Sequence, residues 1–71
     1  MNDRFEIDPQ IRHGHPVIKR TRVPVTSILA EVAEGTPFEE IQHQYDVTLE
    51  DIRAAVAFAN ELVEQQAFIA T

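Results

Sequence analysis

Pro24 marks the point at which the hydrophobic pattern of the chain changes from period two to the period of a helix. Before it, Phe5-Glu6-Ile7 alternates apolar and charged side chains, which is typical of a half-buried strand, and a second apolar pair, Val17-Ile18, follows. After it, apolar residues recur every three or four positions. The sequence therefore predicts one mainly α domain, with a short β-hairpin arm over residues 1–24 and a three-helix region over residues 25–71.

The chain is short and has no covalent staples. Its 71 residues are expected to bury a smaller fraction of their unfolded surface than a domain of about 100 to 150 residues does. There is no cysteine, so neither a disulfide nor a thiolate metal site can add stability. The expected strands are too short to be stable alone and must lie on the helices or on a second copy of the arm. We therefore expect an oligomer or a complex with a partner protein.

The distribution of charge is uneven. The formal net charge of −6 argues against a general nucleic-acid binder. However, four of the six basic side chains fall between Arg12 and Arg22, whereas the region from Glu31 to Glu64 holds nine acids and one base, Arg53. The basic stretch from Arg12 to Arg22 is either a binding surface for phosphate or an acidic partner, or the solvated face of a small hairpin.

Two sequence features bear on location. No apolar run approaches the roughly 18 residues that a membrane span needs. The first residues also lack the basic and then apolar layout of a signal peptide. We expect a soluble, cytoplasmic protein.

Capping residues set the expected boundaries of the first two helices. Gly35 ends the apolar periodicity that starts after Pro24, as expected for the residue that follows a helix C-terminus. Thr36, Pro37 and Glu39 then combine an N-cap, a proline at the first helical position and a capping-box glutamate. The sequence therefore predicts that Thr36 caps the second helix.

A third helix is predicted from Leu49, because Thr48 and Asp51 repeat the capping pattern, and no breaker occurs before Gln65. At about 100° per residue, two apolar stripes run along this helix. The first is expected to pack on the other helices and consists of Leu49, Ile52, Val56, Ala59 and Val63. The second either completes the core against the hairpin or contacts another chain, and consists of Ala55, Phe58, Leu62 and Ile69.

The second and third helices, joined through Tyr45 to Thr48, have the dimensions of a helix-turn-helix. In that motif, the N-terminal residues of the second member enter the DNA major groove. Here Glu50 and Asp51 would be repelled by the phosphates, and Arg53 is the one base nearby. The third helix either reads DNA or is only part of a three-helix scaffold, and its charge favours the scaffold.

The polar clusters do not have the composition of a catalytic or metal site. His13 and His15 flank a glycine, but a metal needs three or four ligands, and nothing nearby except Asp8 adds to the set. The acidic pairs at the helix starts are explained by a favourable interaction with the helix dipole. The sequence shows neither a nucleophile with its base nor a phosphate-binding loop. It therefore predicts no enzyme, no cofactor and no metal.

A run of short motifs carries a family resemblance. They include Gly14-His15-Pro16-Val17-Ile18, Thr21-Arg22-Val23-Pro24-Val25 and Leu49-Glu50-Asp51-Ile52. In these motifs the chain resembles, over roughly Phe5 to Ala59, the family catalogued as domain of unknown function number 433. The resemblance implies an N-terminal strand or hairpin before a homeodomain-like helix-turn-helix. It also implies a VapB-type antitoxin, which neutralises a PIN-like toxin ribonuclease and commonly binds its own operator as a dimer.

The sequence departs from the family pattern at Arg20. The family usually has glycine directly before the Thr-Arg pair, and here that position is Arg20. Either the turn does not need a positive φ at this position, or Arg20 adopts one at some cost in free energy. The substitution also adds charge to the basic stretch.

We therefore expect a non-catalytic antitoxin-like homodimer that binds a PIN-like ribonuclease toxin and, as a further possibility, operator DNA. A stand-alone helix-turn-helix transcription regulator and a purely structural interaction module are the alternatives. The residues assigned to each contact are listed by role. Operator phosphates are assigned to Arg12, Lys19, Arg20, Arg22 and Arg53; the toxin to Phe58, Glu61, Leu62, Glu64 and Ile69; and the dimer contact to Phe5, Ile7, Val17 and Ile18.

Overall fold

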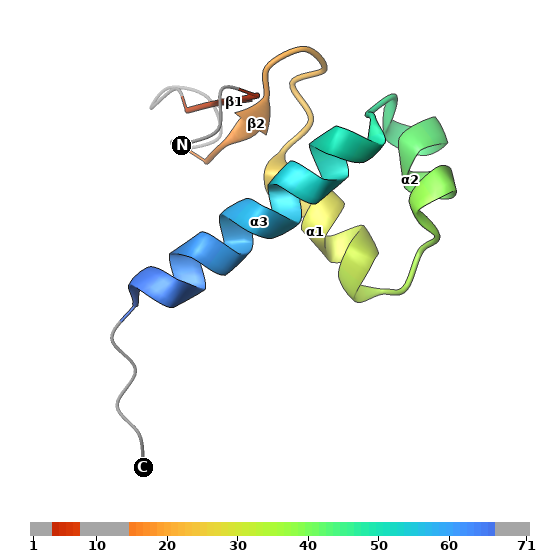
Figure 1. Cartoon of the computed structure of the whole chain (residues 1–71). Helices are drawn as coiled ribbons and strands as arrows, with labels where there is room; N and C mark the ends of the chain where they lie inside the picture. The colour runs from red at the N-terminus through yellow and green to blue at the C-terminus, as the bar shows by residue number, and fades with distance from the viewer. Residues whose placement is uncertain (1–3, 8–14, 67–71) are drawn as a thin grey trace.

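The computed structural model describes residues 4–7 and 15–66 of the chain. In these ranges the chain forms two short strands and three helices (Figure 1). They are β1 (Phe5–Glu6), β2 (Val17–Ile18), α1 (Val25–Ala33), α2 (Phe38–Tyr45) and α3 (Leu49–Gln65). This confirms the predicted fold class, a mainly helical domain with a short antiparallel hairpin before three packed helices.

The hairpin pairs β1 antiparallel to β2, with Phe5 opposite Ile18. After β2 the chain turns back on itself: the Ile18 N–H donates to the Val23 carbonyl at 2.8 Å, and the Arg22 N–H donates to the Ile18 carbonyl at 2.6 Å. These two bonds close a tight loop of four residues. We call it the basic loop, and it consists of Lys19, Arg20, Thr21 and Arg22.

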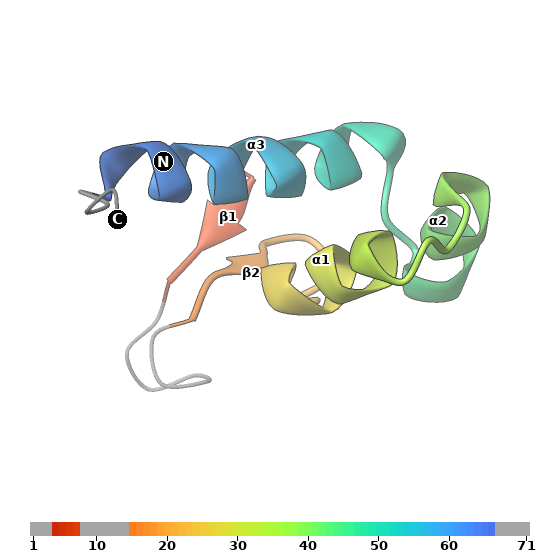
Figure 2. The same cartoon turned by 90° about the horizontal axis from the view of Figure 1, so that it is seen from below.

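The core lies where the three helices and the hairpin meet. Its largest completely buried apolar side chains come from every element after β1, two of them from α1, and they are Ile18, Val25, Ile28, Ile41 and Ile52. Helix α3 runs along one edge of the molecule, with the hairpin, α1 and α2 all on its other side (Figure 2). One long side of α3 is therefore left outside the fold.

The start of α2 differs from the expectation. The helix begins at Phe38 with Pro37 as its N-cap residue, and no side chain caps it. Instead of capping, the Thr36 hydroxyl donates to Oε1 of Glu31 in α1 at 2.7 Å. The prediction that Thr36 caps α2 is wrong, because a tertiary partner binds its hydroxyl. Gly35 does follow the end of α1, with a φ of 84°.

The start of α3 is as predicted. Thr48 accepts a hydrogen bond from the Asp51 N–H at 3.0 Å, and the Asp51 carboxylate accepts one from the Thr48 N–H at 2.9 Å. This reciprocal capping box satisfies two backbone donors at the helix start.

The covered side of α3 is only partly the predicted one. Ile52, from the stripe expected to pack on the other helices, is completely buried. Val56 and Val63, from the same stripe, are exposed. Ala55, from the second stripe, is completely buried, and Phe58 packs against the core. The reason is the hairpin, which covers the Phe58 side: the rings of Phe5 and Phe58 meet edge to face with their centroids 5.3 Å apart.

Over the described residues, no helix combines the length and the apolar character needed to cross a membrane.

Candidate functional site

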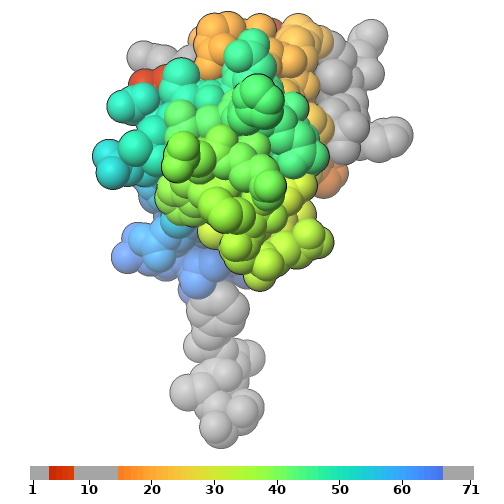
Figure 3. All heavy atoms as spheres, turned by 90° about the vertical axis from the view of Figure 1, so that its right-hand side faces the viewer, coloured from red at the N-terminus to blue at the C-terminus, as the bar shows by residue number. Residues whose placement is uncertain are grey.

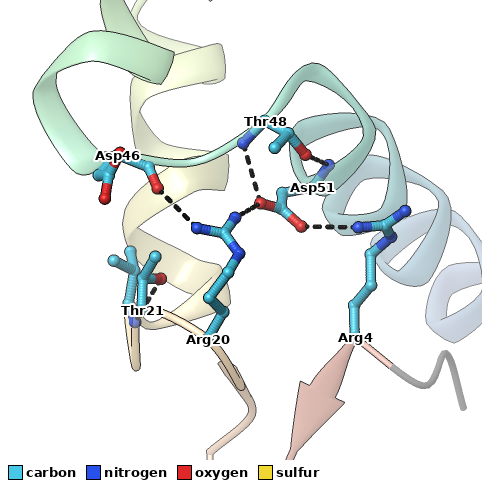
Figure 4. Close-up of polar contacts among 7 residues, drawn as sticks. Arg4, Arg20, Thr21, Asp46, Thr48 and Asp51 are labelled. Atoms are coloured by element: carbon cyan, nitrogen blue, oxygen red, sulfur yellow. Dashed lines mark hydrogen bonds and ion pairs between the residues drawn. The ribbon is translucent and has the colours of Figure 1, made fainter.

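The first turn of α3 contains a buried carboxylate whose two oxygens both bind arginines. The Asp51 side chain is 2% exposed. Its Oδ1 accepts from Nη1 of Arg4 at 3.0 Å, and its Oδ2 accepts from Nη2 of Arg20 at 2.6 Å (Figure 4). Because Oδ2 also accepts the Thr48 N–H of the capping box, one side chain both starts α3 and binds the two sides of the hairpin arm.

Arg20 makes a second contact with the connection between α2 and α3. Its Nη1 donates to the backbone carbonyl of Asp46 at 3.2 Å. Asp46 ends α2 in the left-handed conformation, with a φ of 56°. The basic loop therefore lies against the turn between the two helices, and the space-filling view shows the loop beside that turn (Figure 3).

The backbone conformation shows whether Arg20, at the position where the family resemblance implies glycine, adopts a positive φ. Arg22 and Asp46 are the non-glycine residues with a positive φ in residues 4–7 and 15–66, and Arg20 is not among them. The turn therefore does not need a positive φ at Arg20. The strained position of the basic loop is Arg22, with a φ of 61°.

The surroundings of Asp51 keep it ionised. Burial alone would raise the pKa of its carboxyl group, but the contacts with Thr48, the hydrogen bond from Arg4 and the charge of Arg20 outweigh burial. The net result is a pKa below the ordinary value of 3.8. At neutral pH, Asp51 is a carboxylate whose charge is turned inward and does not face a ligand.

This arrangement changes how the basic side chains can act. Arg20, which we assigned to operator phosphates, has 53% of its side chain exposed, but its guanidinium is bound to Asp51 and Asp46. Arg22 pairs with Glu6 at 3.2 Å in an exposed ion pair. Lys19 and Arg53 are exposed, on the basic loop and on α3 respectively, and make no ion pair within the described ranges. Arg12 lies outside the described residues.

A second polar cluster joins α1 to α2. Glu31 of α1 accepts the Tyr45 hydroxyl through Oε2 at 2.7 Å, and it accepts the Thr36 hydroxyl through Oε1. The bond from Tyr45, followed by that from Thr36, lowers the pKa of Glu31, although burial opposes the shift. The same bond to Glu31 raises the pKa of Tyr45. Both carboxylate oxygens are occupied, so we assign this cluster to positioning α2.

The residues assigned to a toxin contact have unequal surroundings. Phe58 is partly buried against Phe5, whereas Leu62, one turn further along α3, is 45% exposed. Glu61 and Glu64 are exposed beside it. The assigned Ile69 lies outside the described residues.

The residues assigned to a dimer contact are mostly part of the core. Phe5, Val17 and Ile18 are buried within the chain, and Ile7 is exposed. Burial of the first three inside the chain explains how such short strands are stabilised, because they pack on the helices. Only Ile7 of this set offers substantial surface to a second copy.

The histidine pair lies mostly beyond the described ranges. His15 is exposed, whereas His13 and Asp8 lie outside the described residues. Among the residues that the structure describes, no group of three or more histidine and carboxylate side chains could hold a metal ion.

The sequence did not predict Asp51 as the residue that joins the arm to α3. Its capping role followed from its spacing to Thr48, but Arg4 and Arg20 are 47 and 31 positions away. The one sequence signal for this contact was Arg20 itself, which stands where the family resemblance implies glycine.

The fold and the site define a class of protein: a small three-helix domain whose N-terminal hairpin is fixed to the start of the last helix by a buried carboxylate. Residues 6–59 match the family model described as "Protein of unknown function (DUF433)", so the chain belongs to that family. No curated protein matches the chain significantly, and no solved structure does.

Proposed function

We propose that this chain is the antitoxin-like member of a toxin–antitoxin pair and binds a PIN-like ribonuclease directly. The observation that carries the proposal is the exposed apolar end of α3, where the Leu62 side chain is 45% exposed. Leu62 continues the covered side of the helix, but the described part of the chain does not cover it. An apolar side chain of this size left open on a small domain is a candidate anchor for a partner protein.

Charge supports the same type of partner. Glu61 and Glu64 are exposed in the same helical turn as Leu62, and the chain as a whole carries a formal charge of −6. A ribonuclease has a basic surface to bind RNA, and carboxylates around an apolar anchor are complementary to such a surface. The expected contact is therefore an apolar anchor with exposed carboxylates at the same end of α3.

The experiment first looks for a small reading frame that encodes a PIN-like protein next to the gene of this chain, and then co-expresses the two proteins. We expect the two proteins to co-purify and the ribonuclease activity to fall on mixing. Leu62→Asp is expected to abolish co-purification, whereas Glu50→Gln, at the far end of the same helix, retains it. Absence of such a neighbouring gene, or two proteins that remain separate when mixed, would contradict the proposal.

A second candidate function has its own observation. The basic loop lies against the turn between α2 and α3, so Lys19 lies near the end of α3 that a helix-turn-helix directs to DNA. On this proposal the chain is a stand-alone transcription regulator without a toxin partner, and it contacts operator phosphates through the basic loop.

Loss of Lys19 distinguishes this candidate function. Lys19→Ala is expected to reduce the magnitude of the slope of log affinity against log salt by about one for duplex DNA, because one phosphate contact is lost. A slope that stays the same would mean that Lys19, the base of this loop that makes no ion pair within the described residues, does not contact phosphate, and would contradict this candidate function.

A further inference from the structure

Two valines of the first apolar stripe of α3 are exposed, beyond the buried Ile52 of the same stripe. Val56 and Val63 are 42% and 56% exposed, and they lie seven positions apart, so they share one side of the helix two turns from each other. Figure 2 shows this helix along one edge of the molecule, with every other described element on its opposite side. The fold therefore leaves an open apolar strip on its longest helix.

Charged residues of opposite sign lie at the two ends of this strip. Arg53 comes before Val56, and Glu64 comes directly after Val63. Within the part of the chain that the structure describes, Arg53 makes no ion pair. Glu64 accepts a hydrogen bond from Asn60 Nδ2 at 3.3 Å in an exposed contact within the same helix, which costs little to exchange.

We propose that this side of α3 is the contact between two copies of the chain, with their α3 helices packed antiparallel. A helix with a base at one end of an apolar strip and an acid at the other is complementary to itself in that direction. A two-fold axis places each Arg53 beside the partner's Glu64 and makes the same pair twice. A second copy already carries an acid and a base at the matching spacing, whereas a different partner would need its own acid and base placed to pair with Arg53 and Glu64.

Helix geometry fits this arrangement. Arg53 and Glu64 are equally distant from a centre between Phe58 and Ala59, so both ion pairs form at once when the helices cross there. The two pairs lie roughly 16 Å apart, at about 1.5 Å of rise per residue. Val56 and Val63 of each copy fall between them. One helix side is a small contact area, so we expect a dissociation constant on the order of 10 μM or weaker.

This proposal rests on the proposed antitoxin function, which includes a homodimer. It assigns the dimer contact to a particular surface of the chain. It takes the place of a strand-to-strand dimer, since Phe5, Val17 and Ile18 are buried in the core. It also leaves Leu62 open, because Leu62 lies about 160° or more around the helix from Arg53 and Glu64 and about 100° or more from both valines. One α3 can therefore bind a second copy and a toxin on different sides.

The test is sedimentation equilibrium of the isolated full chain at low salt, with charge reversal at the two positions. Arg53→Glu alone and Glu64→Arg alone each turn two attractive contacts into two repulsive ones. We expect each to weaken self-association at least about fivefold. The double variant Arg53→Glu/Glu64→Arg rebuilds both pairs in reverse and is expected to return to within about twofold of the parent. All four positions on this strip are exposed, and far-UV circular dichroism checks that each variant is folded.

Two further variants separate this surface from the toxin anchor. Val56→Asp is expected to abolish self-association, and Leu62→Asp to leave it unchanged. A chain that is monomeric at every concentration, single reversals without effect, or a double variant as weak as the two singles combined would each overturn the proposal. Glu64 is also assigned to the toxin contact, so the comparison with ribonuclease co-purification uses Arg53→Glu and Val56→Asp, which change no residue of that contact. These two variants are expected to lose self-association and to keep co-purification, so the two proposals fail separately.

Discussion

Arg20 Nη2 lies 2.6 Å from Oδ2 of Asp51, across 31 positions of sequence. The contact joins the loop that follows β2 to the first turn of α3. It uses a carboxylate that also caps the helix, so one interaction ties the position of the arm to the start of the third helix. The stability of this small domain should therefore depend strongly on Asp51.

Removal of the carboxylate tests this dependence. Asp51→Ala is expected to lower the free energy of unfolding by about 2 to 3 kcal/mol, because the cap and both arginine contacts are lost together. The loss is smaller than for a completely buried ion pair, because the Arg4 and Arg20 side chains are 42% and 53% exposed and solvent screens their charges. Urea denaturation followed by circular dichroism measures the loss. The control is Glu50→Ala, an exposed acid in the same turn, with an expected change below about 0.5 kcal/mol.

The same group predicts the acid dependence of stability. The pKa of Asp51 in the folded protein lies below its ordinary value of 3.8. Its contribution to stability is therefore complete above that value and is lost as the pH falls below it through the lower folded pKa. We expect the midpoint of urea unfolding to decrease below about pH 4 and Asp51→Asn to flatten that decrease. An equal acid dependence in both proteins would contradict the role given to Asp51.

Two arginines of the basic loop should respond differently to glycine. Arg20→Gly, which restores the family residue, is expected to cost about 1 to 2 kcal/mol, because the contacts with Asp51 and Asp46 are lost. Arg22→Gly removes an exposed ion pair but relieves a positive φ of 61°, so we expect a change within about 0.5 kcal/mol of zero. Thermal unfolding of both variants measures the contrast, and equal losses would mean that backbone strain at Arg22 is unimportant.

Tyr45 reports on the cluster between α1 and α2. Its hydroxyl donates to Glu31, and this bond raises the pKa of Tyr45 above the ordinary value of 10.0. In Glu31→Gln the pKa is expected to fall back toward that value. The chain has one tyrosine and no tryptophan, so the near-ultraviolet absorbance of tyrosinate gives the titration directly. Glu34→Gln, which removes a more distant charge, should shift the pKa much less.

Phe58 and Leu62 are neighbours on α3 with different expected roles. Phe58→Ala removes a ring packed on Phe5 and the core, and should destabilise the isolated chain by about 2 to 3 kcal/mol. Leu62→Ala, at a 45% exposed position, should cost less than about 1 kcal/mol and act mainly on partner binding. Denaturation of the isolated chain separates the two, and a large loss of stability in Leu62→Ala would place that residue in the core.

Local patterns predicted the parts of the fold that depend on local chemistry. The bounds of α1 followed from apolar spacing and Gly35, and the start of α3 followed from Thr48 and Asp51. Each of these signals acts within about one helical turn, so it is readable without knowledge of the tertiary structure.

The failures have a tertiary cause. Thr36 is a good N-cap residue by sequence, but its hydroxyl donates to Glu31. Periodicity gave two apolar stripes on α3 but not which residues of each are covered, because that depends on where the hairpin packs. The contact from Arg20 to Asp51 joins distant positions, and a charged residue in a basic stretch gives no sign of an internal partner.

The ion pair between Arg20 and Asp51 also limits how parts of this family can be exchanged. An arm transplanted from a relative with glycine at position 20 would bring no side chain to Oδ2 of Asp51 or to the Asp46 carbonyl. The recipient would then hold a buried carboxylate with one arginine instead of two. We expect chimeric proteins to fold well only when the hairpin and the first turn of α3 come from the same parent. The two segments must therefore be exchanged together.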